Sequence, residues 1–371
     1  AGFTTTGSSV IGDPGALPHG ILFWRSFTQW VGGMGIIVLS VAILPLLGMG
    51  AVQLVRAESP GPTPDRLTPR FADTAKRLWV VYVGLTALEA VLLWLGDMSL
   101  FEAINHSFTT MSTGGFSTNS GSLGAYSAYA QWVVIVFMIL AGTSFALHYK
   151  ALTVGVKAYL KSVELRVYLT LLGVAAAAML FGTWGQGAHE TIRDAIFTSA
   201  TLITTTGYGT HDFALWGPAL QIMVVGLMFV GGMAGSTSGS MKTYRLDVLT
   251  QASRMDVRRL IQPRGVFVTR VGKDPVPDSI VEAVQTFFLL YMFAFMTGTF
   301  GFAIVTRLAG TELGIVEMVS AVATALGNVG PGLETLGPTE TFASVPAVGK
   351  LMLSGLMVIG RLEILPILIL F

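Results

Sequence analysis

Long apolar stretches recur along the chain and alternate with segments rich in serine, threonine and glycine. The apolar stretches cover residues 32–50, 78–95, 130–147, 167–184, 215–234, 285–305 and 345–371. A helix of about 20 mostly apolar residues crosses the hydrocarbon core of a bilayer. The pattern therefore predicts an all-α, multi-pass integral membrane protein in which each stretch is a candidate span.

The composition agrees with this class. Of the 371 residues, 52% are hydrophobic and 12% are charged, whereas about 25% of a soluble domain is charged. So few charges cannot coat a water-facing surface, which argues against a soluble enzyme or a disordered chain. The net charge of +1 gives no general attraction to nucleic acid. The lack of cysteine excludes disulfide frameworks, thiolate zinc sites and cysteine nucleophiles, and we predict neither enzymatic activity nor an organic cofactor.

Basic residues concentrate in three connections, at residues 56–77, 150–166 and 242–273, which hold 17 of the 22 lysines and arginines. The positive-inside rule places these connections in the cytoplasm. Two apolar stretches separate each basic connection from the next. Each pair of spans must therefore cross outward and return, with a semi-polar segment between the two.

The semi-polar segments resemble one another when they are aligned on a glycine: Gly7, Gly115, Gly207 and Gly330. An acidic residue precedes the glycine by 13 positions wherever that position exists: Glu102, Asp194 and Glu317. Equal offsets with unequal loops indicate an internal repeat. We interpret the chain as four pseudo-symmetric helix–pore loop–helix repeats around a central ion pore, at residues 1–58, 59–158, 159–262 and 263–371. The first repeat is expected to be truncated, with only its filter and inner helix.

The segment from each acid to the glycine suits a short helix that enters only half of the membrane, with the acid capping its start. Non-helical backbone at membrane depth must be buried in protein or line a watery cavity. Four such stretches could form a ring of carbonyl oxygens that replaces the hydration shell of a potassium ion. Glycine provides backbone conformations that other residues disfavour. The predicted selectivity filter comprises Thr5, Thr6, Gly7, Thr113, Gly114, Gly115, Thr205, Thr206, Gly207, Asn328, Val329 and Gly330.

A glycine- and serine-rich segment at residues 231–240 follows the fifth apolar stretch. Glycines four residues apart are typical of a helix-packing face, but the serines and threonine among them favour a polar loop in the pore. The predicted gate comprises Gly231, Gly232, Gly235, Ser236, Thr237, Ser238, Gly239 and Arg361. Arg361 lies inside the last apolar stretch, where an arginine is costly and marks a functional candidate. We expect it to face the pore and to contact the loop, because Glu363 is two residues away and lies on another helix face.

Lys242 and Arg245 follow this loop. They either neutralise lipid headgroups or relay the movement of a cytoplasmic partner, and the sequence does not separate these roles.

Together these residues resemble the Trk/Ktr/HKT superfamily of potassium transporters, with the greatest similarity to its bacterial TrkH branch. Three stretches besides the filters carry the resemblance: residues 54–62 (LVRAESPGP), 231–242 (GGMAGSTSGSMK) and 360–364 (GRLEI). It implies potassium uptake, with rubidium also accepted, through a pore in the bacterial inner membrane that the loop obstructs. It further implies a homodimer surrounded by membrane lipids and a cytoplasmic, TrkA-like, nucleotide-binding regulatory ring. Serine at a filter glycine goes with sodium preference in this superfamily, so glycine at all four positions favours potassium. The fourth filter is the least regular, with Asn328 and Val329 where the others carry threonine or glycine. The alternative function is that of a sodium-conducting or weakly selective relative.

Overall fold

The computed structural model describes residues 1–42, 71–183, 188–265, 267–272 and 274–364. The predicted first basic connection and the motif at 54–62 therefore lie largely outside the described residues, as does the end of the last apolar stretch. The helices of the first half are α1 (His19–Ala42), α3 (Phe71–Trp94), α4 (Leu100–Met111), α5 (Ala128–Ala141), α6 (Phe145–Val154), α7 (Lys157–Lys161) and α8 (Val163–Gly182). Those of the second half are α9 (Ala188–Ile203), α10 (Pro218–Leu227), α11 (Thr243–Ile261), α12 (Asp278–Leu308), α13 (Ile315–Gly327) and α14 (Ala347–Arg361).

Minor elements complete the described part of the chain. Short 3-10 helices occupy Pro14–Ala16, Ser122–Ala125, Phe213–Leu215, Glu334–Leu336 and Phe342–Ser344. Strands β1 (Arg270–Val271) and β2 (Asp274–Pro275) pair antiparallel, with Arg270 opposite Pro275. These elements connect the helices, so the protein is predominantly helical, as the sequence predicts.

Among the described residues, α3, α8 and α12 are long and apolar enough to cross a membrane, and α5 with α6 would make a fourth span if the bent pair is counted as one. The predicted span at 130–147 is not a continuous helix, because α5 and α6 meet at an angle of 93°. The predicted span at 215–234 is also interrupted, since α10 ends at Leu227.

A short helix precedes each of the last three glycine-bearing stretches: α4, α9 and α13. Glu102 and Glu317 each accept a hydrogen bond from the backbone N–H three residues earlier, at 2.9 Å and 2.5 Å, which confirms the predicted caps. The prediction is wrong for Asp194, because α9 already begins at Ala188. Asp194 instead accepts a 2.9 Å hydrogen bond from the hydroxyl of Thr210, beyond the glycine.

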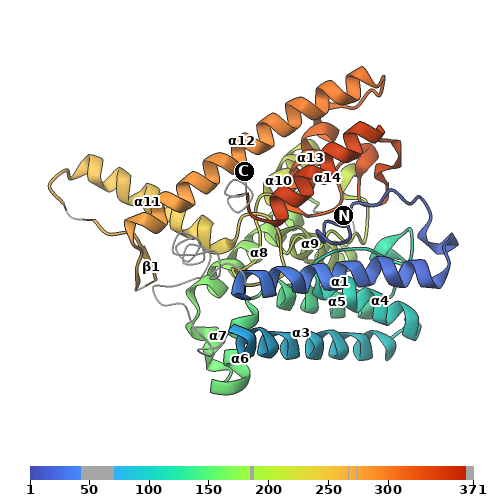
Figure 1. Cartoon of the computed structure of the whole chain (residues 1–371), viewed down its shortest axis with the longest axis horizontal. Helices are drawn as coiled ribbons and strands as arrows, with labels where there is room; N and C mark the ends of the chain where they lie inside the picture. Colours follow the sequence, from blue (N-terminus) through green and yellow to red (C-terminus); the bar gives the residue numbers. More distant parts are fainter. Residues whose placement is uncertain (43–70, 184–187, 266, 273, 365–371) are drawn as a thin grey trace.

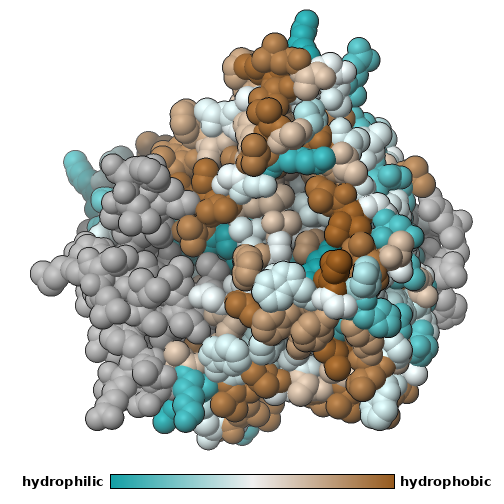
Figure 2. All heavy atoms as spheres, turned by 45° about the vertical axis from the view of Figure 1, so that its right-hand side comes forward, coloured by the Kyte–Doolittle hydropathy of each residue, from teal (hydrophilic) through white to brown (hydrophobic). Residues whose placement is uncertain are grey.

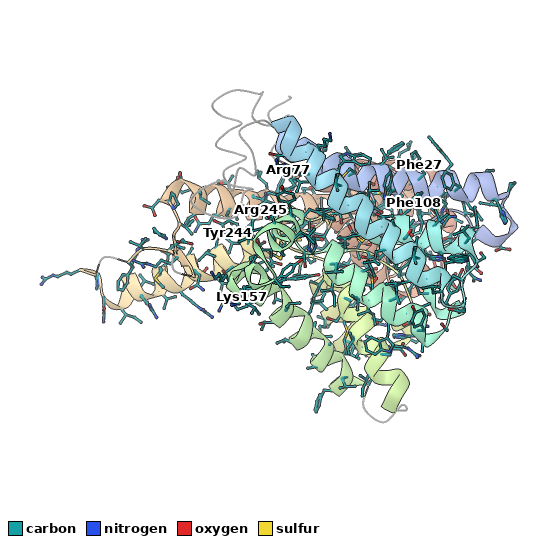
Figure 3. All side chains as sticks on the ribbon, turned by 90° about the horizontal axis from the view of Figure 1, so that it is seen from below. Phe27, Arg77, Phe108, Lys157, Tyr244 and Arg245 are labelled. Carbon is teal, nitrogen blue, oxygen red and sulfur yellow. The ribbon has the colours of Figure 1, made fainter. Side chains whose placement is uncertain are left out.

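The short helices form the centre of the packing. Each of them contacts the long helix before it and the helix after it: α4 with α3 and α5, α9 with α8 and α10, and α13 with α12 and α14. Each also contacts the first long helix after the preceding glycine-bearing stretch: α4 with α1, α9 with α5, and α13 with α10. The helices α6, α7 and α11 lie toward one end of the molecule (Figure 1), where Lys157 and Arg245 are found, whereas Phe27 and Phe108 lie toward the other end (Figure 3).

Large apolar side chains remain on the outside of the molecule. On α12, Leu289, Phe293, Met296 and Phe300 are all more than 60% exposed. Brown apolar patches alternate with polar side chains on the face drawn in Figure 2. Such surfaces are compatible with a lipid environment, where an exposed leucine or phenylalanine carries no hydration cost.

Candidate ion pathway

The four glycine-bearing stretches meet in a closed ring. A Cβ atom on any of the four glycines would overlap a carbonyl oxygen of the next stretch: Gly7 that of Gly114, Gly115 that of Thr206, Gly207 that of Val329 and Gly330 that of Thr6. The neighbours follow chain order, and the fourth stretch returns to the first. In this structure none of the four glycines can be replaced without a shift of the facing backbone, since even an alanine would overlap a carbonyl oxygen.

The stretches share one unusual backbone conformation. The residue two positions before each glycine has a positive φ: Thr5 50°, Thr113 54°, Thr205 57° and Asn328 54°. The glycines follow with φ of 80°, 74°, 82° and 122°. A threonine in the left-handed region is uncommon and persists only where its surroundings enforce it. Asn328 adopts the same conformation as the threonines, so the divergent fourth sequence keeps the local geometry.

Backbone hydrogen bonds repeat in the same way. The left-handed residue donates from its N–H to the carbonyl three residues earlier, and the next residue donates to the carbonyl five residues earlier. In the third stretch these bonds join Thr205 to Leu202 at 3.0 Å and Thr206 to Thr201 at 2.9 Å. The amides are thus turned back toward the short helices. Within the described part of the chain, the carbonyls of Thr6, Thr206 and Val329 accept no hydrogen bond, so the ring offers acceptors that suit a cation.

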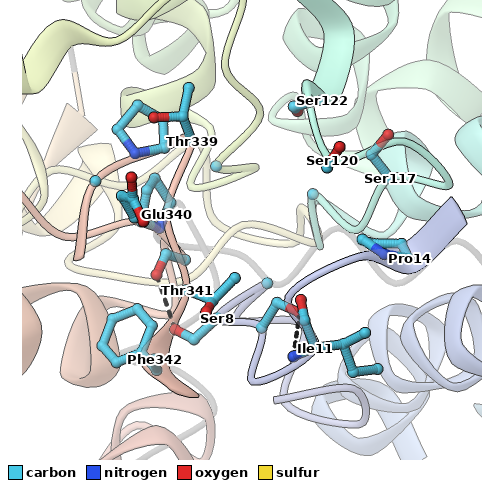
Figure 4. Close-up of a pocket in the computed structure, with 18 of the residues that line it drawn as sticks. Ser8, Ile11, Pro14, Ser117, Ser120, Ser122, Thr339, Glu340, Thr341 and Phe342 are labelled. Carbon is cyan, nitrogen blue, oxygen red and sulfur yellow. Dashed lines mark hydrogen bonds between the residues drawn. The ribbon is translucent and has the colours of Figure 1, made fainter. Parts of the chain in front are cut away.

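An open mouth lies next to the ring and is lined by all four glycines. Its walls come from the segments that follow the glycines, with Ser117, Glu340 and Thr341 among them (Figure 4). Arg25 also lines it. The guanidinium of Arg25 donates a 2.8 Å hydrogen bond to the carbonyl of Ser117 and lies 3.6 Å from the ring centroid of Phe116.

The segment at residues 231–240 is a buried loop and not a helix. It runs between the end of α10 at Leu227 and the start of α11 at Thr243. The alternative of a helix-packing face is therefore wrong. Apart from Gly235, its residues are buried, and Ser236, Thr237 and Ser238 are each at most 1% exposed.

This loop is bonded to the base of the ring. The hydroxyl of Thr113 donates to the carbonyl of Thr237 at 2.8 Å, and the N–H of Gly239 donates to the hydroxyl of Thr205 at 2.6 Å. The hydroxyl of Ser240 donates to the carbonyl of Gly327 at 3.0 Å. Residues from three of the four stretches therefore hold the loop.

Arg361 reaches the same loop from the end of α14. Its side chain is 5% exposed, and Nη1 donates a 2.7 Å hydrogen bond to the carbonyl of Thr237. The structure thus brings Arg361 to the loop, as the sequence predicts. Glu363 is engaged elsewhere, in a 2.5 Å ion pair with Arg245.

Lys242 and Arg245 are both buried, at 7% and 4% exposure. Nζ of Lys242 donates to the carbonyl of Ser238 in the loop. The guanidinium of Arg245 lies 4.0 Å from the ring centroid of Phe287 and pairs with Glu363. Buried side chains are not available to lipid headgroups, so the contacts favour a role in linking the loop, α11 and the end of α14.

The family model described as TrkH, cation transport protein, matches residues 1–371. The chain belongs to the TrkH family. It is 39% identical to the Trk system potassium uptake protein TrkH of Salmonella typhimurium over 381 residues, which is 100% of this chain and 77% of that protein. It is 40% identical to the TrkH of Vibrio parahaemolyticus over 99% of this chain and 76% of that protein.

A solved structure agrees with this assignment. The crystal structure of the potassium transporter TrkH from Vibrio parahaemolyticus matches with a TM-score of 0.87 and 36% identity, over 100% of this chain and 76% of that one. The chain is therefore an integral membrane protein of a family of cation transporters, and not an enzyme. The predicted resemblance is confirmed at the level of the family.

In this TrkH-family chain, sequence reasoning missed three features near the ring. One is the break between α5 and α6, where the carbonyl of Gly142 accepts a 2.8 Å hydrogen bond from Met233 of the loop. Another is Tyr208, whose hydroxyl lies 2.5 Å from that of Thr109 and so ties the third stretch to α4, the short helix before the second stretch. The last is Gln29. Only the Gly-Thr-Ser sequence at the break carried a recognisable signal, because these residues interrupt an apolar run.

Proposed function

We propose that this protein carries potassium ions across the bacterial inner membrane through the ring formed by the four glycine-bearing stretches. The observation that carries the proposal is the closed ring itself, with the same left-handed backbone in each stretch. The names of the relatives, which are potassium uptake proteins, support the choice of ion. The repeats would be residues 1–58, 59–158, 159–262 and 263–371 around one central pore.

Selectivity would arise from the carbonyl oxygens. A dehydrated potassium ion exchanges its water for these oxygens at little net cost if they stand at suitable distances. Rubidium, which is chemically similar, should also pass. Because the amides of each stretch are bonded back toward the preceding residues, the stretches cannot turn a donor toward the ion without breaking these bonds. This arrangement favours cations and excludes anions.

The loop at 231–240 and Arg361 would form the gate. The loop is bonded to the base of the ring through Thr113 and Thr205. A buried guanidinium at Thr237 places a positive charge next to the loop, and repulsion by that charge raises the barrier to a cation that leaves the ring. Opening would require the hydrogen bonds between loop, ring and Arg361 to separate.

The gate would be controlled from the cytoplasmic side of the membrane. Lys242 and Arg245 connect the loop to α11 and to the end of α14, and the last turn of α11 contains Arg258 and Arg259. We propose that a cytoplasmic nucleotide-binding ring acts on this region, and that two copies of the chain form a dimer. The naming of the relatives as parts of a Trk system supports a regulatory component.

Ion uptake in bacteria that lack their own potassium uptake systems tests the proposal. The chain should support uptake of potassium and rubidium well above that of sodium. Gly207→Asp should abolish selective uptake, because any side chain there overlaps the Val329 carbonyl. Gly217→Asp is the matched control, since Gly217 has open space around its Cα. Equal flux of potassium and sodium would support the weakly selective alternative, and normal selective uptake by Gly207→Asp would refute the filter.

A further inference from the structure

Gln29 is a fully buried amide on α1 that reaches the second glycine-bearing stretch. Its side chain is 0% exposed. Nε2 donates a 2.6 Å hydrogen bond to the carbonyl of Gly114, and Oε1 accepts a 3.1 Å hydrogen bond from the N–H of Phe116. One side chain therefore binds the backbone on both sides of Gly115.

This amide also occupies the place of a missing side chain. At the position before the ring glycine, the other three stretches carry Thr6, Thr206 and Val329, whereas the second carries Gly114. A Cβ on Gly114 would overlap Cδ and Oε1 of Gln29. The space taken by a threonine or valine side chain in the other stretches is thus filled by the amide from α1.

The helix that carries Gln29 is itself fixed close to the ring. A Cβ on Gly32 would overlap the carbonyl of Phe3 in the first stretch, and one on Gly33 would overlap Ser112 in the second. Close backbone approach of this kind leaves little room for α1 to shift. The position of the amide is therefore set by packing and not by the side chain alone.

The hydrogen bond acts on one oxygen of the ring. The Gly114 carbonyl is the one that a Cβ on Gly7 would meet. A carbonyl oxygen has two lone pairs, so it can accept from Gln29 and still coordinate a cation. Within the described part of the chain, the equivalent carbonyls of Thr6, Thr206 and Val329 have no such donor. The second stretch is therefore held in a way that the other three are not.

We propose that Gln29 is a positioning residue of the filter, which fixes the direction of the Gly114 carbonyl and so contributes to the preference for potassium over sodium. The inference rests on the proposed potassium uptake. Without the amide, the carbonyl can tilt toward a smaller ion, and the N–H of Phe116 loses its partner.

Gln29→Leu tests this directly, because leucine keeps much of the volume and removes both hydrogen bonds. The ratio of potassium to sodium uptake should fall about fivefold to tenfold, which corresponds to the loss of one or two net hydrogen bonds. Ser26→Ala is the matched control, since Ser26 is another buried residue of α1. A purely structural residue would lower the amount and melting temperature of the protein without altering that ratio, and an unchanged ratio in Gln29→Leu overturns the proposal.

Two further variants test the role of Gln29 if Gln29→Leu does not accumulate in the membrane. Gly114→Thr alone should abolish uptake through its clash with the amide, and Gln29→Ala with Gly114→Thr should regain part of it, because the threonine then has room as in the first and third stretches. A double variant no better than Gly114→Thr contradicts the proposal. Failure of the potassium proposal itself would be seen separately, as poor selectivity of the unaltered chain.

Discussion

The guanidinium of Arg361 donates a 2.7 Å hydrogen bond to the carbonyl of Thr237, and that same oxygen accepts a 2.8 Å hydrogen bond from Thr113 at the base of the ring. A single peptide group thus joins the last helix to the second glycine-bearing stretch. Any displacement of the loop must break or move both bonds.

Arg361→Ala should increase the flux of cations through the resting protein by about tenfold. It removes a charge-assisted hydrogen bond worth about 1.5–3 kcal/mol, and each 1.4 kcal/mol is a factor of ten. The measurement is rubidium flux into proteoliposomes that contain the purified protein. Arg307→Ala, at an exposed arginine near the end of α12, should leave the flux unchanged. Flux equal to the unaltered protein in Arg361→Ala would count against the gate.

Thr113→Val should also raise the resting flux, but by less, about threefold, because it removes a neutral hydrogen bond worth about 1 kcal/mol. Valine keeps the β-branched shape of the side chain. The same proteoliposome assay applies. Thr153→Val is a suitable control, since the exposed hydroxyl of Thr153 bonds only within α6. If Thr113→Val altered selectivity and left the resting flux untouched, the bond to Thr237 would not restrain the loop.

The ion pair of Arg245 and Glu363 should respond to a charge exchange. Arg245→Glu alone places two acids together in a buried site, and the loss of a buried pair costs about 3–5 kcal/mol. The double variant Arg245→Glu with Glu363→Arg should recover part of the lost melting temperature of the purified protein in detergent. A double variant less stable than both single ones would indicate that the contact with Phe287, rather than charge, holds Arg245.

The hydrogen bonds that Asp97 accepts predict that the stability of the folded protein depends on pH. This acid lies between α3 and α4 and accepts hydrogen bonds from the N–H and hydroxyl of Ser127 at 2.9 Å and 2.6 Å. Slight burial favours the neutral carboxyl, but these bonds outweigh it and lower the pKa of Asp97. A lowered pKa stabilises the fold at pH values above the unfolded pKa, and that contribution disappears as the pH falls through the folded value.

Asp97→Asn should therefore lower the melting temperature slightly near pH 7, and the difference from the unaltered protein should vanish in acid. Asp13→Asn is a control, because Asp13 bonds only within its own exposed turn. A difference that is constant over the whole pH range would show that the charge of Asp97 is not responsible.

The sequence predicted the ring and the loop because their residues interrupt long apolar stretches with threonine, serine and glycine. Arg361 was predictable for the same reason, since its charge is costly in an apolar stretch. His106 is a buried residue of α4 that forms hydrogen bonds within its own helix and to Ser117. For the ring, the loop and Arg361, a polar or charged residue in an apolar stretch is itself the signal, and it can be read from the sequence alone.

Other features depend on contacts between distant residues and could not be predicted. Gly142, Thr143 and Ser144 mark the place of the break between α5 and α6, but the contact that stabilises it joins Gly142 to Met233 of the loop, far away in the chain. The spacing of Asp194 from Gly207 is the same as that of Glu102 from Gly115 and Glu317 from Gly330, but it does not fix where α9 begins. A lone glutamine in an apolar helix gives no periodic signal, so the role of Gln29 was not apparent.

The ring closes within one polypeptide, and this has a consequence for how such a ring can change. In an assembly of identical chains, a substitution would appear at every quarter of the ring at once. Here each quarter can be altered alone, as Gly114 and the buried side-chain amide of Gln29 illustrate. In the proposed filter, mutation can therefore adjust the electrostatic field around an ion by one oxygen at a time, and a loss in one quarter can be offset by a residue far away along the same chain.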